Sequence, residues 1–425
     1  MATFHVNNFG CRANQAEGAA LAAALARGGL RPADAAETAD WVVLNTCTVT
    51  AEADAEARRA IRRLRRRHPE TRVVVTGCYA QRAPEELRDL PGVVCVVGRG
   101  GAASILGGLV PLAALAPAPA AAHAPAEDRT RPILQVQEGC GRRCSFCVVP
   151  FVRGDSRSLP LGEVLAQAQA LEAAGALEVV ISGINLGQWG RDRDARLGLP
   201  DLLRALLERT TLPRLRLSSV EPADWTPDLT ALLASEARVA RHVHLPLQSG
   251  SAAVLRRMRR RYTPAAYARR VLDLRRRAPL AAIGADVMVG FPDESESEFE
   301  ETRSLVASLP FTYLHVFPFS PRPGTEAAAR LASGEWREVP PELAAARARE
   351  LRRLQAGKRA AHLLAMVGLR LDVITLHDTR AHGAWALSDN YLRVALPEAH
   401  AANRMVAVEI TAAADGYLEA RSLTA

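Results

Sequence analysis

The chain has 425 residues, enough for two or three domains that each bury a core of their own. Hydrophobic residues make up 48% of it and aromatic residues only 5%, so alanine and leucine must fill much of the interior. The net charge of +8 is compatible with a polyanionic partner. Lys358 is the only lysine among 54 basic residues, which indicates biased base composition as well as function.

Neither export nor a membrane anchor is expected. Met1 leads straight into a β-like run, which excludes a secretory signal. Residues 100–126 are uncharged over a length that could cross a bilayer, but alanine dominates and four prolines interrupt them. A short helix followed by a Pro/Ala linker is expected there, with the linker over 111–130. Reduced cysteines in such a chain predict the cytoplasm and argue against a disulfide framework.

The first domain, expected over residues 1–110, alternates short strands with helices. The strands are expected at 3–8, 41–46 and 72–77, and the helices at 16–26 and 51–67. This alternation predicts a parallel α/β sheet whose strands all end at one edge.

Three cysteines of this domain occupy equivalent places. Cys11, Cys47 and Cys78 each follow the end of a strand, at the edge where open sheets bind ligands. They are therefore expected to meet in space as a metal-binding group. The alternative is three buried, inert cysteines. Cys95 lies inside the apolar run 92–98 and is expected to be a core residue.

The second domain, expected over 131–360, repeats the β/α pattern six times. Its strands are expected at 133–138, 177–183, 215–220, 242–248, 283–290 and 313–319. The intervening helices are expected at 161–174, 199–208, 226–235, 263–277 and 296–309. Six units predict a partial (β/α)6 barrel, with its site at the carboxyl ends of the strands.

The third domain, expected over 365–425, consists of short strands separated by turns. They are expected at 369–376, 383–387, 391–395, 404–411 and 417–421. This run predicts a small antiparallel β-barrel, a fold that often binds nucleic acid by charge and stacking. Trp385, Tyr391, Arg393 and Arg404 are the candidates for such contacts. The alternative is a β domain that only packs on the second domain.

A tight cysteine motif, C-x3-C-x2-C, follows the first strand of the second domain. Cys140, Cys144 and Cys147 provide three thiolates, and a [4Fe–4S] cluster held by three thiolates keeps one iron open for chemistry. Gly139 and the glycine at 141 let the loop wrap closely around a cluster. A zinc site completed by a distant histidine is the alternative.

This loop, at the start of a partial barrel, resembles the radical S-adenosylmethionine (SAM) superfamily. The resemblance implies that the open iron binds SAM. The run 180–187 resembles the segment that receives the SAM amino group, and 285–292 resembles the adenine-contacting segment. The runs 217–222 and 244–250 end the third and fourth strands. The SAM contacts that the resemblance implies are Gly183, Asn185, Ser219, Gln248, Asp286 and Gly290.

Within that superfamily, the whole chain resembles the methylthiotransferases. The match rests on the runs 10–17, 45–50 and 76–81, each centred near one N-terminal cysteine. It implies that Cys11, Cys47 and Cys78 hold a second [4Fe–4S] cluster whose open iron carries sulfur. It also implies that the C-terminal domain is a nucleic-acid-binding TRAM domain.

Three branches of this family act on different substrates. The runs 183–190, 216–222 and 255–263 most resemble the branch that modifies N6-threonylcarbamoyladenosine in tRNA. The alternatives are isopentenyladenosine in tRNA and an aspartate of a ribosomal protein. The chain departs from the family at Asp293-Glu294, where Gly-Glu is common, and in most of the TRAM region.

The resemblance implies methylthiolation of carbon 2 of the adenine at tRNA position 37. One SAM would supply the methyl group, and a second would supply the radical that abstracts the ring hydrogen. The tRNA anticodon loop exposes the base, and a sulfur donor and a reducing electron donor are further expected partners. Arg153, Arg157 and the run 256–261 are candidate contacts to substrate anions or RNA.

Two other function classes are compatible with the cysteines. A non-catalytic iron–sulfur electron carrier would need neither six barrel strands nor an open iron. A zinc-dependent RNA-binding protein would hold zinc in place of iron. Counts of iron, sulfide and zinc, and the formation of 5′-deoxyadenosine from SAM, separate these classes from the enzyme.

Overall fold

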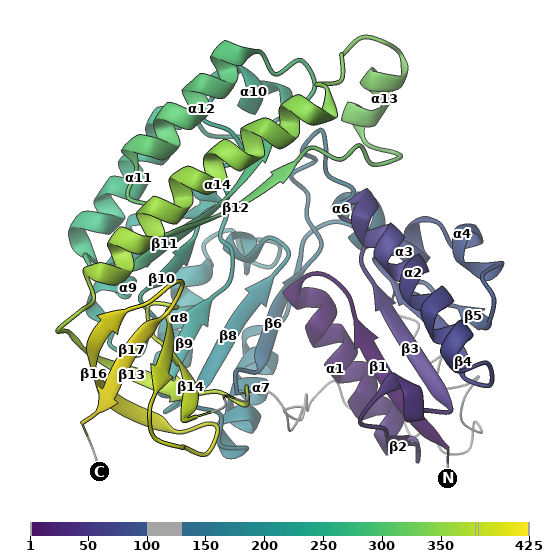
Figure 1. Ribbon diagram of the computed structural model, residues 1–425, viewed down its shortest axis with the longest axis horizontal. Coiled ribbons are helices and arrows are strands. Elements are labelled where there is room, and N and C mark those ends of the chain that lie inside the picture. Colours follow the sequence, from purple (N-terminus) through teal and green to yellow (C-terminus); the bar gives the residue numbers. More distant parts are fainter. Residues whose placement is uncertain (1, 100–129, 379, 381, 424–425) are drawn as a thin grey trace. The chain divides into compact units, whose positions relative to one another are not determined.

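A computed structural model describes residues 2–99, 130–378, 380 and 382–423 (Figure 1). The chain forms two compact units. The first contains the described part of residues 1–126 together with 138–157 and 320–329, and the second contains 127–137, 158–319 and 330–425. The short helix and nearly all of the linker expected between the first two domains lie outside the described residues. None of the helices described is long and apolar enough to cross a membrane.

A five-stranded parallel sheet forms the centre of the first unit, in the order β2-β1-β3-β4-β5. Its strands are β1 (Thr3–Asn8), β2 (Arg31–Pro32), β3 (Trp41–Thr46), β4 (Arg72–Gly77) and β5 (Val93–Val96). The three predicted strands are confirmed, and β2 and β5 extend the sheet on either side. The prediction for Cys95 was wrong: β5 is an edge strand, and this cysteine is exposed on it.

Helices cover this sheet and complete its core. They are α1 (Arg12–Arg27), η1 (Ala36–Thr38), α2 (Ala51–Arg67), α3 (Cys78–Arg82), α4 (Glu85–Arg88) and α6 (Val149–Arg153). Helix α2 begins at Thr50, whose side chain accepts a hydrogen bond from the Ala53 N–H. Its apolar stripe buries Ile61 against Val42 and Val75. The start of α1, which follows β1, and the start of α3, which follows β4 directly, therefore lie at the carboxyl ends of parallel strands.

Six parallel strands of the second unit confirm the predicted partial barrel. One sheet has the order β7-β6-β8-β9 and the other β10-β11-β12, and bridges such as Ser219 with His244 join them. The strands are β6 (Ile133–Glu138), β7 (Arg157–Ser158), β8 (Glu178–Gly183), β9 (Arg214–Leu217), β10 (His242–His244), β11 (Ala282–Val289) and β12 (Tyr313–Pro318). The short β7 is an addition to the six expected strands.

Helices follow these strands as the β/α pattern predicts. They are α7 (Leu161–Ala173), η3 (Leu186–Gln188), α8 (Leu199–Arg209), η4 (Pro222–Asp224), α9 (Pro227–Ser235), α10 (Ala252–Arg257), α11 (Pro264–Arg277), α12 (Glu296–Ser308), α13 (Glu326–Ala332) and α14 (Pro341–Leu364). Figure 1 shows α14, which was not predicted, lying across β12 with α12 beside it. The strand residues beneath these helices, such as Ala285 and Val287, are fully buried.

The second unit also contains a closed five-stranded barrel, in the order β13-β14-β15-β17-β16, as predicted for a TRAM-like domain. The barrel was expected to be antiparallel throughout, but β15 and β17 pair in parallel. Its strands are β13 (Arg370–Thr375), β14 (Ala384–Ser388), β15 (Arg393–Leu396), β16 (Met405–Ala413) and β17 (Leu418–Ser422). Val373, Val394 and Val408 pack in its core. Because the barrel closes, each of its described strands pairs on both sides.

Candidate functional site

The thiols of the three N-terminal cysteines come together in the structure. Cys11 immediately precedes α1, Cys47 follows β3, and Cys78 begins α3 directly after β4. The Sγ atoms of Cys11 and Cys78 each lie 3.8 Å from the same oxygen, Asn14 Oδ1. A Cβ added to Gly10 would lie 2.6 Å from Cys47 Sγ, so only glycine leaves room for that thiol. We call these three side chains the N-terminal thiol group.

Buried hydrogen bonds hold Asn14 beside these thiols. Its Nδ2 donates to the carbonyls of Phe9 and Thr46, each at 2.9 Å, and Asn45 Nδ2 donates to the Asn14 carbonyl at 2.6 Å. Because both amide hydrogens are used, the Asn14 oxygen is directed to the sulfur atoms. These hydrogen bonds fix the orientation of the Asn14 side chain beside the thiols.

Arg153 supplies a positive charge to the same site. Its side chain is 1% exposed, and Nη1 donates to Glu17 at 3.0 Å and to Glu138 at 2.8 Å. Nη2 donates to Asn14. The hypothesis that Arg153 contacts substrate anions is wrong, because these acceptors enclose it. Arg157 remains exposed and stays a candidate.

Burial raises the pKa values of the buried thiols, whereas the positive charge of Arg153 lowers them. Burial raises the pKa of Cys78 to about 12, and Arg153 opposes that rise. Burial likewise raises the pKa of the Cys47 thiol. Ligand binding requires thiolates, so an incoming metal must displace these protons, and the guanidinium stabilises the anions that result. None of the seven cysteines, all of which the structure describes, forms a disulfide, so the three thiols of the N-terminal thiol group are available as ligands and fit an iron–sulfur cluster.

The C-x3-C-x2-C motif forms a partly exposed loop before α6. Hydrogen bonds from Cys140 N–H to Gly154 O (3.0 Å) and from Cys147 N–H to Cys144 O (3.1 Å) shape it. Gly139 has φ +69°, and a Cβ there would lie 2.0 Å from the carbonyl oxygen of Asp155. Glycine is thus required at the start of the loop. Three soft, accessible thiols on a short loop fit the donor set of an open-iron cluster.

Two of the predicted SAM contacts lie together at the end of β8. The Asn185 N–H donates to Gln137 Oε1 at 2.7 Å, and a Cβ on Gly183 would lie 2.9 Å from the same oxygen. Ser219 is exposed at the end of β9. These positions are at the carboxyl ends of parallel strands, where barrels bind ligands, and their role as SAM contacts stays a prediction.

Of the other three predicted contacts, Asp286 lies within β11, Gly290 directly follows that strand, and Gln248 forms a bridge with Val287 of β11. Gln248 has φ +62°, its N–H donates to the carbonyl of Asp286 at 2.8 Å, and its buried Oε1 has no partner within the described residues. Such an orphaned acceptor fits a site that receives an N–H or O–H group from a ligand. Gly290 has a packing role, because a Cβ there would lie 2.7 Å from Ala344 Cβ in α14.

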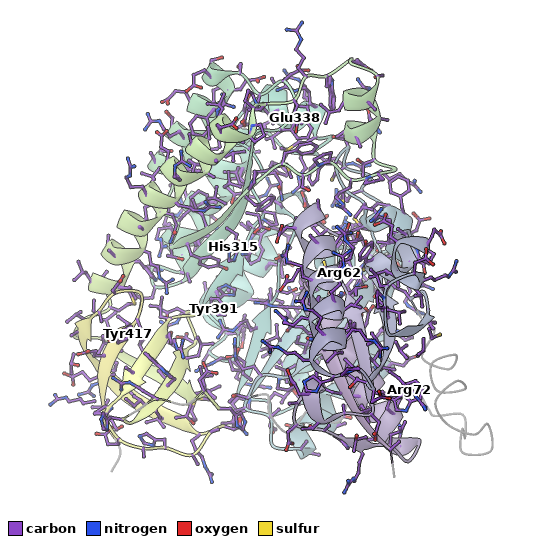
Figure 2. The ribbon with its side chains drawn as sticks, turned by 45° about the vertical axis from the view of Figure 1, so that its right-hand side comes forward. Arg62, Arg72, His315, Glu338, Tyr391 and Tyr417 are labelled. Carbon is purple, nitrogen blue, oxygen red and sulfur yellow. The ribbon has the colours of Figure 1, made fainter. Side chains whose placement is uncertain are left out.

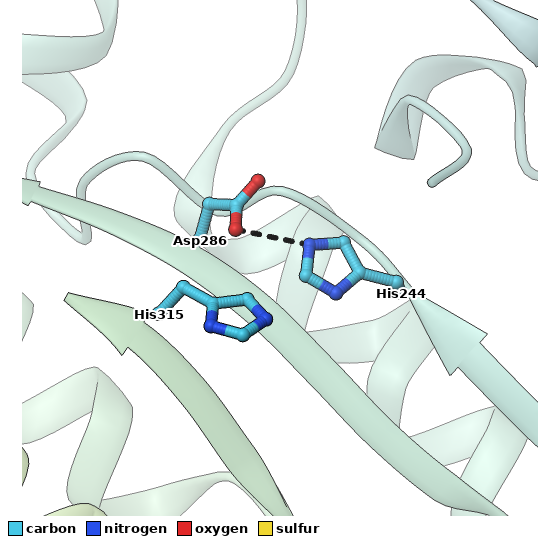
Figure 3. A group of neighbouring side chains, drawn as sticks. All are labelled: His244, Asp286 and His315. Atoms are coloured by element: carbon cyan, nitrogen blue, oxygen red, sulfur yellow. Dashed lines mark ion pairs between the residues drawn. The ribbon is translucent and has the colours of Figure 1, made fainter. Parts of the chain in front are cut away.

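A group of polar side chains on β10, β11 and β12 was not predicted as a unit. His244, Asp286 and His315 place one ligand atom each within 4.8 Å of one another (Figure 3), and we call them the histidine cluster. His244 Nε2 lies 3.1 Å from Asp286 Oδ1. The Tyr313 hydroxyl lies 2.9 Å from His244 Nδ1 and 2.8 Å from His242 Nε2. The spacings His-x-His and Tyr-x-His, which put alternate residues on one strand face, were the available signal.

The predicted nucleic-acid contacts divide into two groups. Tyr391, labelled in Figure 2, is half-buried within the second unit. Its ring centre lies 4.4 Å from that of His242, so it is not an exposed stacking platform. Arg393 lies over the Trp385 ring at 4.1 Å and is exposed, as is Arg404. In the run 256–261, two arginines form ion pairs with glutamates 298 and 221.

Two family models match the chain. Residues 3–98 match the family described as "Uncharacterized protein family UPF0004", and residues 134–306 match the Radical SAM superfamily. The first match spans the N-terminal thiol group, and the second spans the C-x3-C-x2-C loop and most of the strands of the partial barrel. Membership of the second implies an iron–sulfur cluster and SAM.

Several curated relatives are similar to this protein over most of the chain. "Threonylcarbamoyladenosine tRNA methylthiotransferase MtaB" of Bacillus subtilis is 40% identical over 77% of this chain and 76% of its own length. The protein of the same name from Aquifex aeolicus is 34% identical over 91% and 94%. "tRNA-2-methylthio-N(6)-dimethylallyladenosine synthase" of Erythrobacter litoralis is 35% identical over 90% and 88%.

A solved structure shares the fold. The radical S-adenosylmethionine methyltransferase TsrM from Kitasatospora setae, with cobalamin and a [4Fe-4S] cluster bound, superposes with a TM-score of 0.58. The likeness covers 79% of this chain and 78% of that chain at 18% sequence identity. At that identity it supports the architecture alone.

Proposed function

Because the chain belongs to the radical SAM methylthiotransferase family, in the branch of the MtaB proteins, we propose that it adds a methylthio group to carbon 2 of N6-threonylcarbamoyladenosine at tRNA position 37. The observation that carries the proposal is the N-terminal thiol group: Cys11 and Cys78 lie beside the same amide oxygen of Asn14, and Cys47 lies against Gly10, the residue before Cys11. A radical SAM enzyme without sulfur insertion has no need of this second thiol group.

The proposed reaction uses two [4Fe–4S] clusters with different roles. Cys140, Cys144 and Cys147 hold the [4Fe–4S] cluster that binds SAM, and the N-terminal thiol group holds a second one. Together these groups and SAM supply a carbon-centred radical and an activated sulfur atom. The protein itself must bind, orient and shield the reactants.

Named residues carry out these tasks. Asn14 and Arg153 orient and stabilise the N-terminal thiolates. Gln248, which forms a bridge with Val287 of β11, offers its Oε1, unpartnered among the described residues, to an N–H or O–H group of SAM. The glycine at 183 and the Asn185 amide shape the adjacent strand end.

The substrate base must leave its stack to reach a radical site. An anticodon loop is single-stranded, so its bases turn outward at low cost. Arg393, which is exposed, and the half-buried ring of Trp385 beneath it fit contact with the RNA backbone and a base. A sulfur donor and a low-potential electron donor complete the proposed partners.

The test is an anaerobic reaction of the reconstituted protein with SAM, a reductant and tRNA that carries N6-threonylcarbamoyladenosine. Nucleoside mass spectrometry should show the 2-methylthio product, and 5′-deoxyadenosine should form alongside it. Protein with iron that forms no 5′-deoxyadenosine would instead be an electron carrier, and protein with zinc but no iron would be a zinc protein.

A second candidate substrate has support from one relative. The Erythrobacter litoralis protein, named for dimethylallyladenosine, is 35% identical over nearly the same span. The same assay with tRNA bearing dimethylallyladenosine separates the two. A product from that tRNA and none from the threonylcarbamoyl tRNA would overturn our choice of substrate.

A further inference from the structure

The chain returns to the first unit after β12. Ser320–Ala329 follows that strand in sequence, yet it belongs to the same compact unit as both groups of cysteines, and we call it the bridging segment. We propose that the bridging segment fixes the distance between the N-terminal thiol group and the C-x3-C-x2-C loop, with Arg322 as its positioning residue. This inference rests on the proposed function, and it assigns a role to residues outside all of the cysteine and SAM motifs.

The first half of the bridging segment contacts the residues that follow Cys47. Arg322 Nη2 donates to Thr48 Oγ1 at 2.8 Å, and it also donates to the carboxylate of Asp54 near the start of α2. Thr48 directly follows Cys47, and its backbone N–H is hydrogen-bonded to the Cys47 sulfur. A displacement of Arg322 would therefore move a residue that touches this thiol.

These contacts are buried. The side chains of Arg322 and Asp54 are 3% and 5% exposed, and Thr48 is fully buried. Asp54 has a second partner in Arg82 Nη2, at 3.0 Å. Removal of the Arg322 guanidinium takes one of two cations from a buried carboxylate, so the surrounding backbone must rearrange or admit water.

The second half of the bridging segment contacts the C-x3-C-x2-C loop. The Ala327 N–H donates to the carbonyl of Ser145 at 2.8 Å, and both residues are buried. Ser145 lies between Cys144 and Cys147, so this hydrogen bond is inside the motif itself. One segment thus holds both groups of cysteines through hydrogen bonds to residues next to the thiols.

A tight turn joins the two halves of the bridging segment. The N–H and the hydroxyl of Thr325 both donate to the carbonyl of Arg322, at 3.1 and 2.7 Å. Pro323 and Gly324, with φ +84° at the glycine, occupy the two central positions as a type II turn requires. The Thr325 carbonyl accepts from the Ala329 N–H at 3.0 Å in α13. A turn closed in this way transmits a displacement that a flexible loop would absorb.

The separation of the two cysteine groups matters for the proposed reaction. The substrate carbon must lose its hydrogen at one site and meet the sulfur held at the other, so both sites must be in reach of one atom. A misplacement of about 1 Å can lower a rate by about 100-fold. If the N-terminal thiol group were displaced, SAM would still be cleaved. 5′-Deoxyadenosine would then form without the methylthio product.

The experiment measures the magnetic interaction between the two reduced clusters by electron paramagnetic resonance, without SAM or tRNA. This interaction weakens steeply with distance, so it reports the spacing of the two sites independently of turnover. We expect Arg322→Met to change it and to raise the ratio of 5′-deoxyadenosine to methylthio product by about 10-fold. Arg322→Lys should restore both, because one nitrogen makes both side-chain contacts of Arg322 and an ammonium can replace it.

Two further variants control for folding. Arg216→Met removes a buried arginine that pairs with Glu178 in the second unit, so it should lower stability and leave the magnetic interaction unchanged. Ser320→Ala removes a single hydroxyl, which accepts from the Ala51 N–H at 3.1 Å. It should fold and change the product ratio in the same direction as Arg322→Met, by about 2-fold. Iron content of about eight atoms per chain verifies that each protein carries both clusters.

Three results would overturn the inference. They are a magnetic interaction that is absent from the wild-type protein, one that is unchanged in Arg322→Met, or one that changes equally in Arg216→Met. If Arg322→Met does not fold, an unchanged interaction in Ser320→Ala is decisive instead. The wild-type enzyme could still form the methylthio product, which would support the proposed function. Conversely, a changed interaction in Arg322→Met of a protein that forms no methylthio product would support the bridging role and overturn the function.

Discussion

Arg153 in the first unit and Arg216 in the second are both buried guanidinium groups, but their partners differ. Arg216 is bidentate to Glu178, at 2.6 and 2.9 Å, and also donates to the carbonyls of Ser388 and Asp389 in the β-barrel. Arg153 has two partly exposed glutamates and an amide oxygen, and it lies in the electrostatic reach of two thiols.

The difference separates a structural charge from a functional one. Every partner of Arg216 is a fixed group of the fold, so its interactions do not change during a reaction. Burial alone would lower the pKa of Arg153. The negative charges of Cys78, Glu17 and Glu138 have the larger effect, so the pKa of Arg153 is raised overall. The thiols lose protons when they bind a metal, so the role of Arg153 depends on what the site holds. Substitutions at each place should therefore give different phenotypes.

The largest effect should come from removing a thiol beside Arg153. Cys47→Ser should lower iron from about eight to about four atoms per chain and abolish the methylthio product. Formation of 5′-deoxyadenosine should remain, because the C-x3-C-x2-C loop is intact. Cys95→Ser, which changes the exposed cysteine of β5, is the control and should behave as wild type. A Cys47→Ser protein with full iron content would refute the second cluster.

Sequence patterns predicted the elements of both regions, because buried parallel strands and capped helices have strong local signals. The sequence patterns gave wrong or missing predictions where tertiary packing determines the burial of a residue or the place of a helix. The run 92–98 is apolar enough for a central strand, yet β5 pairs only with β4, and so Cys95 is exposed. Helix α14 was not predicted, although it packs on β12 and leaves no space for a side chain at Gly290.

The candidate sites, too, could be predicted only as far as local sequence patterns define them. The meeting of Cys11, Cys47 and Cys78 could be predicted, since parallel topology brings strand ends together. The contacts of Arg153 with Glu17, 136 residues away, could not be predicted. The histidine cluster draws on three strands whose register only the fold provides. Local pattern thus predicts which edge is functional, and tertiary structure decides which charges meet there.

The second prediction removes the structural arginine. Arg216→Met leaves Glu178 buried and ionised without its bidentate partner, which should destabilise the second unit by about 3–5 kcal/mol. Urea denaturation followed by tryptophan fluorescence measures this loss. Arg204→Met, at a half-exposed ion pair on α8, is the control and should change stability little. If both variants lost the same free energy of unfolding, the buried Arg216–Glu178 pair would contribute no more to stability than an exposed ion pair.

The third prediction tests the functional arginine. Arg153→Met removes a positive charge near the N-terminal thiolates, so the second cluster should become harder to reduce, by about 60 mV or roughly 1.4 kcal/mol. A redox titration monitored by electron paramagnetic resonance measures the shift. Arg153→Lys keeps the charge and should restore most of the potential even though it loses the fork of hydrogen bonds. If the reduction potential of the second cluster were unchanged in Arg153→Met, Arg153 would have only a structural role.

The smallest effect concerns a buried base that has no acidic partner. Burial, with Arg275 and Arg359 nearby, lowers the pKa of His362 in α14 to about 4, and its Nε2 has no partner among the described residues. The unfolded chain binds this proton near pH 6.5 and the folded chain only near pH 4, so stability falls as the pH drops between these values. His362→Gln should lose about 1 kcal/mol less than wild type between about pH 6.5 and 5.5. Urea denaturation of both proteins at about pH 6.5 and 5.5 measures the difference, and parallel losses would show that His362 is protonated in the folded state. Unlike Arg153 and Arg216, this group adapts to burial by giving up its charge.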